Sequence, residues 1–208
     1  MLRITFITVL ACCAGACSAV SDTMRTVPAF RSEEFVNLNL RRVVFVPLAD
    51  ETAGGADVVA VERAFVEEFE KGTSIEMISL DLSDDRFANN DNPRRTGKYK
   101  LETILELAIR HGADAVLFGA VTAFRAYPPQ NLGLRLDMIS ANSGLTLWSC
   151  NAHFDMADRD AANAVESAYA NYSARSVDSY NWTLTQVSPA RFAGLVAAQA
   201  VATIRNGK

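Results

Sequence analysis

The spacing of hydrophobic positions changes along the chain and predicts a series of elements. Residues 43–48 form a continuous apolar run, which is typical of a strand buried on both faces. Apolar residues then recur at helical spacing over 57–71, run continuously over 75–80, and return to helical spacing over 98–111. This order predicts a βαβα unit, with a polar surface loop over 81–97.

The middle of the chain predicts three longer strands. Residues 113–127 are apolar on both faces, so we expect this strand near the centre of the sheet. Apolar and polar residues alternate over 132–138 and 145–156, a period of two that indicates strands with one buried face. Asn142, Ser143 and Gly144 predict a tight hairpin turn between them, and Gly119 predicts a bulge or a close backbone approach.

Two further helices complete the prediction. Residues 158–172 are rich in alanine, and Ser188 and Pro189 supply an N-cap and a first-turn proline for a last helix. The predicted fold class is therefore α/β (α+β): a mixed β-sheet of about five strands with helices packed on its faces. We expect it to be a single domain over residues 40–208.

The N-terminus has the pattern of an export signal. Arg3 precedes a run of apolar and small residues over 4–16, which is too short to cross a bilayer as a helix. This pattern predicts a signal peptide over 1–16. The polar stretch that follows predicts a flexible tether, so that residues 17–39 lie outside the fold.

The end of the signal resembles a bacterial lipobox. Small residues (Ala14, Gly15 and Ala16) precede Cys17, which we expect to be acylated after cleavage. Two alternatives remain: acylation of Cys12, which would leave an apolar core of only about eight residues, and a plain secretory signal cut near Ala16 or Ala19. Acyl chains would hold the domain on a membrane without spanning it. The resemblance to lipoproteins of diderm bacteria, with Ser18 rather than Asp after the cysteine, implies sorting to the outer membrane.

Charge and cysteine usage exclude some functions. The formal net charge is −4, and basic residues gather only in pairs such as Arg41–Arg42 and Arg94–Arg95, so we expect no nucleic-acid partner. Cys150 is the one cysteine in the body of the chain and is predicted to be a buried apolar residue. No spacing of cysteines suits zinc, and we expect no metal and no cofactor.

Candidate catalytic residues are few. His153 shares a strand face with Asn151 and Asp155, and a histidine beside a carboxylate could act as a base, although a solvent-facing strand residue is the simpler interpretation. Three other candidate sites lack the full motif of their class. The Gly54–Gly55 turn lacks a complete nucleotide-binding motif, and the acidic residues of the 81–91 loop lack the calcium-binding pattern of an EF-hand. Paired carboxylates could serve glycosidase chemistry, but the helical residues Glu62, Glu67, Glu68 and Glu70 are predicted to form a solvated face.

Aromatic residues suggest where a partner protein could bind. Tyr169, Tyr172, Tyr180 and Trp182 cluster in the least regular part of the chain, and Tyr127, Pro128 and Pro129 end the long central strand. Exposed aromatic side chains often anchor a partner. Packing of the first group over the sheet is the alternative interpretation.

Three features together resemble a known family: the opening strand 43–48, the segment His111–Gly119 with the sequence HGADAVLFG, and the hairpin from Leu136 to Trp148. Their pattern is similar to the family of the curli-secretion lipoprotein CsgG, the penicillin-binding-protein activator LpoB and the TolB N-terminal domain. The resemblance implies an α/β sandwich that serves assembly, secretion or regulation at the cell envelope. It carries no catalytic residue.

The predicted function follows from the anchor and from the lack of catalytic motifs. We expect a membrane-anchored envelope lipoprotein that faces the periplasm and binds a partner protein without catalysing a reaction. One alternative is a component of a homo-oligomeric secretion complex. The other is a periplasmic hydrolase or ligand-binding protein that uses His153 and Asp155.

Overall fold

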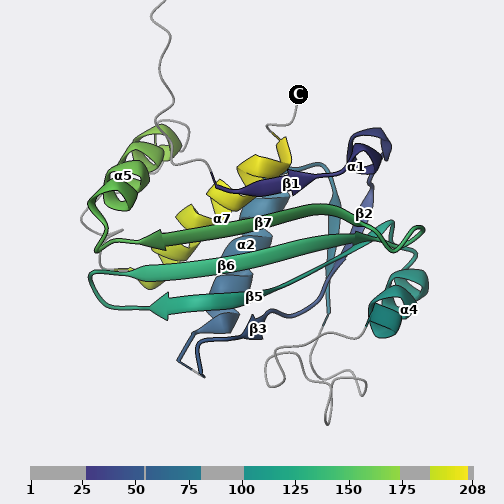
Figure 1. Ribbon diagram of the computed structural model, residues 1–208, viewed down its shortest axis with the longest axis horizontal. Helices are drawn as coiled ribbons and strands as arrows, with labels where there is room; N and C mark the ends of the chain where they lie inside the picture. Colours follow the sequence, from purple (N-terminus) through teal and green to yellow (C-terminus); the bar gives the residue numbers. More distant parts are fainter. Residues whose placement is uncertain (1–26, 54, 81–100, 174–187, 206–208) are drawn as a thin grey trace, which may run out of the picture.

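The computed structural model describes residues 27–53, 55–80, 101–173 and 188–205 (Figure 1). The predicted signal peptide, both candidate acylation sites (Cys12 and Cys17), the acidic loop, Tyr180 and Trp182 lie outside the described residues. Within the described ranges, the chain forms one seven-stranded mixed sheet and five helices. The predicted fold class is confirmed.

The strands follow the order β1-β7-β6-β5-β2-β4, and β3 pairs with β5 beside this path. The pairs β2–β4, β2–β5 and β3–β5 are parallel, whereas β5–β6, β6–β7 and β1–β7 are antiparallel. The strands are β1 (Ala29–Arg31), β2 (Arg42–Phe45), β3 (Ala49–Asp50), β4 (Glu76–Ser79), β5 (Ala115–Arg125), β6 (Asn131–Ser140) and β7 (Thr146–Asp155). The helices are α1 (Glu33–Asn37), α2 (Val58–Gly72), α4 (Leu101–His111), α5 (Arg159–Ser173) and α7 (Pro189–Arg205).

Helix α2 connects the parallel strands β2 and β4, because parallel neighbours need a crossover. Asp57 caps its first turn by accepting a hydrogen bond from the amide of Ala60 at 3.1 Å. Its apolar stripe, buried against the sheet, comprises Val58, Val61, Phe65 and Phe69. The sequence spacing predicted this stripe.

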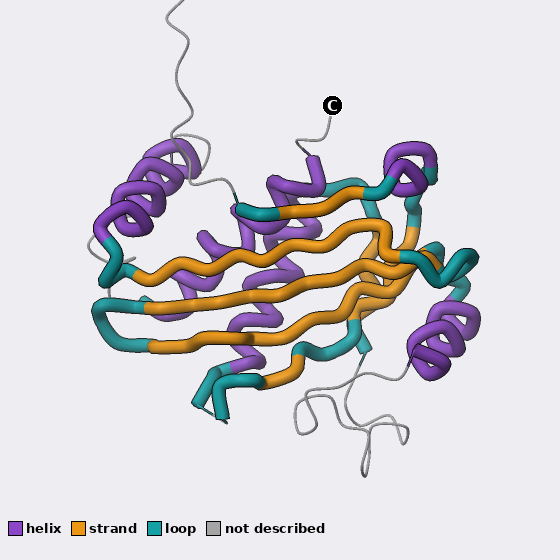
Figure 2. The backbone as a smooth tube through the Cα atoms, in the orientation of Figure 1, coloured by secondary structure: helices purple, strands orange, loops and turns teal. Residues whose placement is uncertain are grey.

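The main core lies between the sheet and a layer that includes α2 and α7, which Figure 2 shows behind the strands. Trp148 of β7 is fully buried there, and its indole nitrogen donates to the hydroxyl oxygen of Thr203 on α7 at 3.1 Å. Ser188 begins α7 as predicted, since its carbonyl oxygen accepts from the amide of Phe192. Residues of α1 and α5 also pack against this core.

A smaller core lies on the opposite side of the sheet. Leu107 and Ala108 of α4 pack there on Val44 of β2, Val46 directly after β2, and Val116 of β5. The buried members of this cluster come from α4, from β2 and β5, and from the segments beside them, and include no residue of β6 or β7. Helix α4 therefore covers the parallel side of the sheet only.

The long antiparallel strands follow the predicted alternation. Leu134, Leu136 and Met138 of β6 are fully buried, whereas Arg135 between them is exposed. Gly144 in the hairpin turn has a φ of 68°, the left-handed region that glycine favours. The irregularity of β5 falls between Val121 and Ala123, not at Gly119, where the backbone of β6 approaches closely instead.

The predicted tether over residues 17–39 is wrong in its last part. Residues Ala29–Arg31 form β1, which pairs with Trp148–Cys150 of β7, and Glu33–Asn37 form α1. Two polar contacts fix this segment: Ser32 accepts from the amide of Phe35 at 3.1 Å, and Glu34 accepts from the hydroxyl of Ser140 at 2.9 Å. Three residues are too few to show a period, so the pattern of hydrophobic positions missed this edge strand. The folded part begins by Val27, which is buried.

Candidate functional site

Strands β5, β6 and β7 turn one face toward α2 and α7 and the other away from them. We call the second the outward face; Figure 1 shows it toward the viewer. Strand alternation and pairing register place on it Phe118 and Arg125 of β5, Asn131, Arg135, Asp137 and Ile139 of β6, Ser149, Asn151, His153 and Asp155 of β7, and Phe30 of β1. Among the described residues, no helix contributes to a core on the outward face of β6 and β7.

His153 and Asp155 lie on the outward face as predicted, but the structure does not join them directly. The ring Nε2 of His153 is 3.0 Å from the amide oxygen of Asn131, and the Nδ2 of Asn131 donates to Asp155 at 3.3 Å. Asp155 also accepts from Arg125 at 2.8 Å and from the amide of Ala157 at 2.9 Å. The carboxylate of Asp155 therefore fixes a strand end and a turn, and it does not orient the histidine as a base.

A second ion pair crosses the middle of the outward face. Arg135 of β6 donates to both carboxylate oxygens of Glu51, one of them at 3.1 Å, and so links β6 to the residue that follows β3. Asp137 lies two residues further along the same face and is half-buried. Burial raises the pKa of the Asp137 carboxyl, and the positive charge of Arg135 opposes this effect only in part.

The predicted partner-binding residues do not form one described site. Tyr127, Pro128 and Pro129 lie in the turn between β5 and β6, where all three are exposed and the side chain of Tyr127 is 81% accessible. Tyr169 of α5 is partly buried against the main core. Tyr172 also belongs to α5, and Tyr180 and Trp182 lie outside the described residues. Of the predicted residues whose side chains the structure describes, Tyr127 is the one exposed aromatic.

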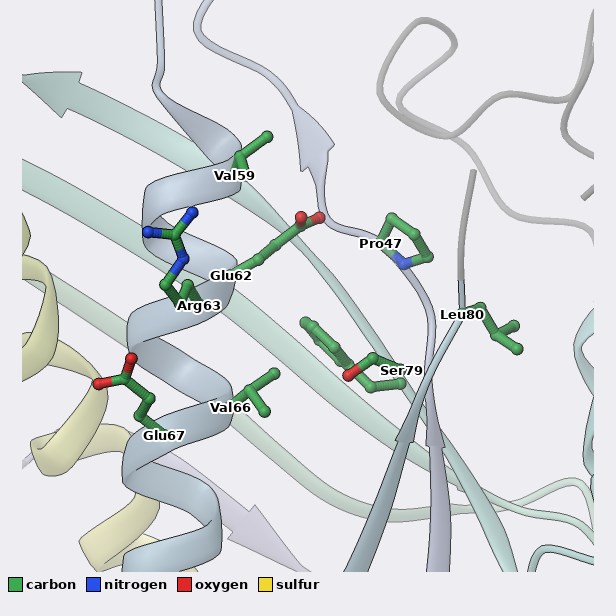
Figure 3. A pocket seen from close by; sticks show the side chains of 9 residues that line it. Pro47, Val59, Glu62, Arg63, Val66, Glu67, Ser79 and Leu80 are labelled. Atoms are coloured by element: carbon green, nitrogen blue, oxygen red, sulfur yellow. The ribbon is translucent and has the colours of Figure 1, made fainter. Parts of the chain in front are cut away.

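A groove of about 310 Å³ opens between α2 and the carboxyl ends of β2 and β4 (Figure 3). It is lined by Phe45, Pro47, Val59, Glu62, Arg63, Val66, Glu67, Ser79 and Leu80. Glu62 points from α2 toward β2, where its Oε1 accepts from the amide of Leu48 at 2.7 Å. This carboxylate serves the loop after β2 and so has a structural role.

The predicted solvated face of α2 is wrong at two of its four carboxylates. Glu62 bonds to the backbone across the groove, and Glu68 is buried, with its carboxylate 2.9 Å from the ammonium of Lys71. The helical period alone placed both on the outer side of α2. Glu67 and Glu70 are exposed as predicted.

The other residues considered as candidates for chemistry have structural roles where the structure describes them. Burial raises the pKa of the Cys150 thiol to about 12, so this side chain is an unreactive core residue, as its isolation in the sequence indicated. Gly54 lies outside the described residues. Asp57 caps the N-terminus of α2 two residues after Gly55, and a carboxylate there opposes phosphate binding. Within the described ranges, no group of three or more acidic, histidine or cysteine residues could hold a metal, and no helix is long and apolar enough to cross a membrane.

The sequence did not identify Phe30 as an exposed residue of the outward face. It also did not show that Asp137 has no ion-pair partner among the described residues. Phe30 fell within the predicted tether, although it lies on an edge strand with 52% of its surface accessible. The alternation in β6 correctly placed Asp137 opposite the buried face. That Asp137 has no ion-pair partner among the described residues could not be inferred, because the nearby Arg135 pairs with a residue 84 positions away.

No protein-family model and no curated protein sequence matches the chain. Solved structures are similar in fold. The PelC dodecamer from Paraburkholderia phytofirmans gives a TM-score of 0.45 at 15% identity, covering 83% of this chain and 97% of that one. The lipoprotein GNA1162 from Neisseria meningitidis gives a TM-score of 0.43 at 17% sequence identity, covering 65% of this chain and 99% of that one. The LpoB C-terminal domain from Salmonella enterica gives a TM-score of 0.44 at 11% identity, covering 57% of this chain and 85% of that one. These likenesses concern the arrangement of elements and assign no function.

Proposed function

We propose that the protein is a membrane-anchored envelope lipoprotein that binds a partner protein through the outward face, without catalysing a reaction. The observation that carries this proposal is the outward face of β6 and β7, against which no described helix packs. His153 and Asp155 are not hydrogen-bonded to each other, since Asn131 lies between them.

Exposed aromatic side chains on this surface and in the turn beside it support binding rather than simple exposure to water. Tyr127 is 81% accessible in the turn between β5 and β6, and Phe30 is 52% accessible on the edge strand β1. Aromatic residues are enriched where proteins bind one another, because a rigid ring buries a large area at low entropic cost. The two ion pairs of the outward face give it a fixed polar pattern that a partner could match.

The proposed anchor restricts where that partner can be. Nine residues separate Cys17 from Val27, the first described residue. At about 3.3–3.6 Å per residue, they keep the start of the domain within roughly 35 Å of the acylated cysteine. We therefore propose a partner that lies in or beside the same membrane. The sequence around Cys17 favours the outer membrane, with the domain facing the periplasm.

Metabolic labelling with a palmitate analogue tests the anchor. We expect the full chain to be labelled, Cys17→Ala to abolish the label, and Cys12→Ala to retain it. Labelling that is lost only in Cys12→Ala would move the anchor to Cys12. An unlabelled full chain would contradict lipidation and leave a plain secretory signal.

Site-specific photo-crosslinking in intact cells tests the binding surface. A photoreactive amino acid at Asn151, exposed on the outward face, should capture one recurrent envelope protein. The same probe at Glu70, exposed on the helical side of the domain, is the matched control and should capture none. A ladder of self-crosslinks would favour the homo-oligomeric alternative instead, and no adduct from the outward face would contradict the proposal.

A further inference from the structure

A row of side chains crosses the outward face from the sheet edge inward. Phe30 of β1 pairs with Ser149 of β7, Ser149 pairs with Asp137 of β6, and Asp137 pairs with Phe118 of β5. Neighbouring strands lie about 4.8 Å apart, so roughly 10 Å separates the backbone at Phe30 from that at Asp137. Paired residues on one face have side chains close enough to contact a single long side chain of a partner.

Charge is unevenly matched along this face. Glu51 pairs with Arg135, and Asp155 pairs with Arg125. The carboxylate of Asp137 makes no hydrogen bond or ion pair with any residue that the structure describes, although it is half-buried and pairs across the sheet with Phe118. A partly desolvated carboxylate without a partner is unfavourable for the isolated domain, which the raised pKa of Asp137 reflects.

We propose that Asp137 receives a lysine or arginine side chain of the partner protein, whose aliphatic stem lies over Phe30 and Ser149. This inference rests on the proposed function and names the chemistry that the outward face recognises. Lysine and arginine combine an apolar stem with a cationic head, which matches a row of aromatic ring, small polar residue and carboxylate. The net negative charge of the chain also favours approach by a basic surface.

A metal ion does not fit this position. Calcium takes six to eight oxygen ligands and magnesium near-ideal octahedral geometry. Within the described ranges, Asp137 belongs to no group of three or more acidic, histidine or cysteine residues that could complete such a set. A carboxylate beside Phe118 suits an organic cation instead, and a cationic side chain brings its own apolar surface.

The test uses the full-length, acylated chain in intact cells, with the photoreactive residue at Asn151. Asp137→Asn removes the charge but keeps the shape, and we expect it to reduce capture of the partner at least tenfold. Glu106→Gln is the control, because it removes one exposed carboxylate on α4, where it pairs with Arg110, and leaves the outward face of β6 and β7 unchanged. Capture by this control should change less than twofold.

A charge exchange completes the test. Mass spectrometry of the adduct locates the captured segment of the partner, and its basic residues are changed one at a time to glutamate. We expect one such change to abolish capture by the wild-type chain and to restore capture by Asp137→Lys.

Each other outcome has a distinct meaning. Unchanged capture by Asp137→Asn, equal loss in Glu106→Gln, or a captured segment without lysine or arginine would overturn this inference and leave the proposed function standing. Absence of any adduct in the wild-type chain would instead overturn the proposed function. Thermal melting of Asp137→Asn separates lost binding from lost folding, since we expect this variant to melt no lower than the wild type.

Discussion

The two faces of the long antiparallel strands differ although the same strands build both. On the inward face, Leu134, Leu136, Trp148 and Ala152 are fully buried against the helical layer. On the outward face, Arg135 and Asn151 are exposed, and the ion pairs that cross it have partly accessible side chains. A period of two thus divides each strand between a packed side and an accessible side.

This difference separates stability from recognition. Burial of apolar area dominates folding, so changes on the inward face should alter the free energy of unfolding strongly. Exposed ion pairs contribute only about 0–1 kcal/mol each, so the outward face can change its pattern at little cost in stability. The comparison fails if outward substitutions destabilise the domain as much as inward ones do.

The largest effect is expected at Trp148. Replacing it with alanine empties a fully buried site and removes the hydrogen bond to Thr203, so Trp148→Ala should lower the free energy of unfolding by about 3–5 kcal/mol. Urea denaturation followed by circular dichroism measures this change. Asn151→Ala, on the outward side of the same strand, is the control and should stay within about 0.5 kcal/mol of the wild type. Similar losses in the two variants would contradict the division between faces.

Gly119 provides the next test, because there the two central strands approach too closely for a side chain. A Cβ built at Gly119 would lie 2.0 Å from the carbonyl oxygen of Arg135. Gly119→Ala must displace the backbone of β6 and should destabilise the domain by about 1–3 kcal/mol in the same measurement.

Gly194 is the matched control for this change. A Cβ there meets nothing within 4 Å on helix α7, so Gly194→Ala should stabilise the domain by about 0.5–1 kcal/mol. A neutral Gly119→Ala would mean that β5 and β6 adjust freely, and that the outward pattern of β6 is less fixed than the structure indicates.

An effect of similar size is expected where a helix side chain bonds to the backbone after β2. Glu62→Ala leaves the amide of the buried Leu48 without its acceptor and should cost about 1–3 kcal/mol. Glu67→Ala, one turn further along α2 and exposed, should change the free energy of unfolding by less than about 0.5 kcal/mol. Equal effects would show that the groove between α2 and β2 is held by packing alone.

These residues also show what the sequence could and could not predict. Alternation in β6 and β7 predicted both faces, and the Ser188–Pro189 pair predicted the start of α7, because such signals are local. Strand β1 is only three residues long and exists by pairing with β7, about 120 positions away. The bond from Glu62 to Leu48 and the ion pair from Arg135 to Glu51 likewise depend on the assembled fold. Among the described residues, Asp137 has no ion-pair partner, and the nearby Arg135 pairs with Glu51 instead.

The smallest expected effect has the opposite sign and depends on pH. Burial raises the pKa of Asp137 above its ordinary value of 3.8, opposed by Arg135 on β6, while the thiol of Cys150 on β7 stays protonated. As the pH rises past 3.8, the unfolded chain loses this proton first, so the wild type loses stability until the pH passes the folded value. Asn cannot ionise.

Asp137→Asn should therefore melt at a higher temperature than the wild type at pH 7, and the difference should shrink toward pH 3. Scanning calorimetry at both pH values measures it. A lower melting temperature at pH 7 would mean that the carboxylate stabilises the isolated domain through a contact within the chain, and Asp137 would then belong to the fold rather than to recognition. A gain in stability together with a loss of partner capture separates the two roles, because a residue that only supports folding cannot produce both.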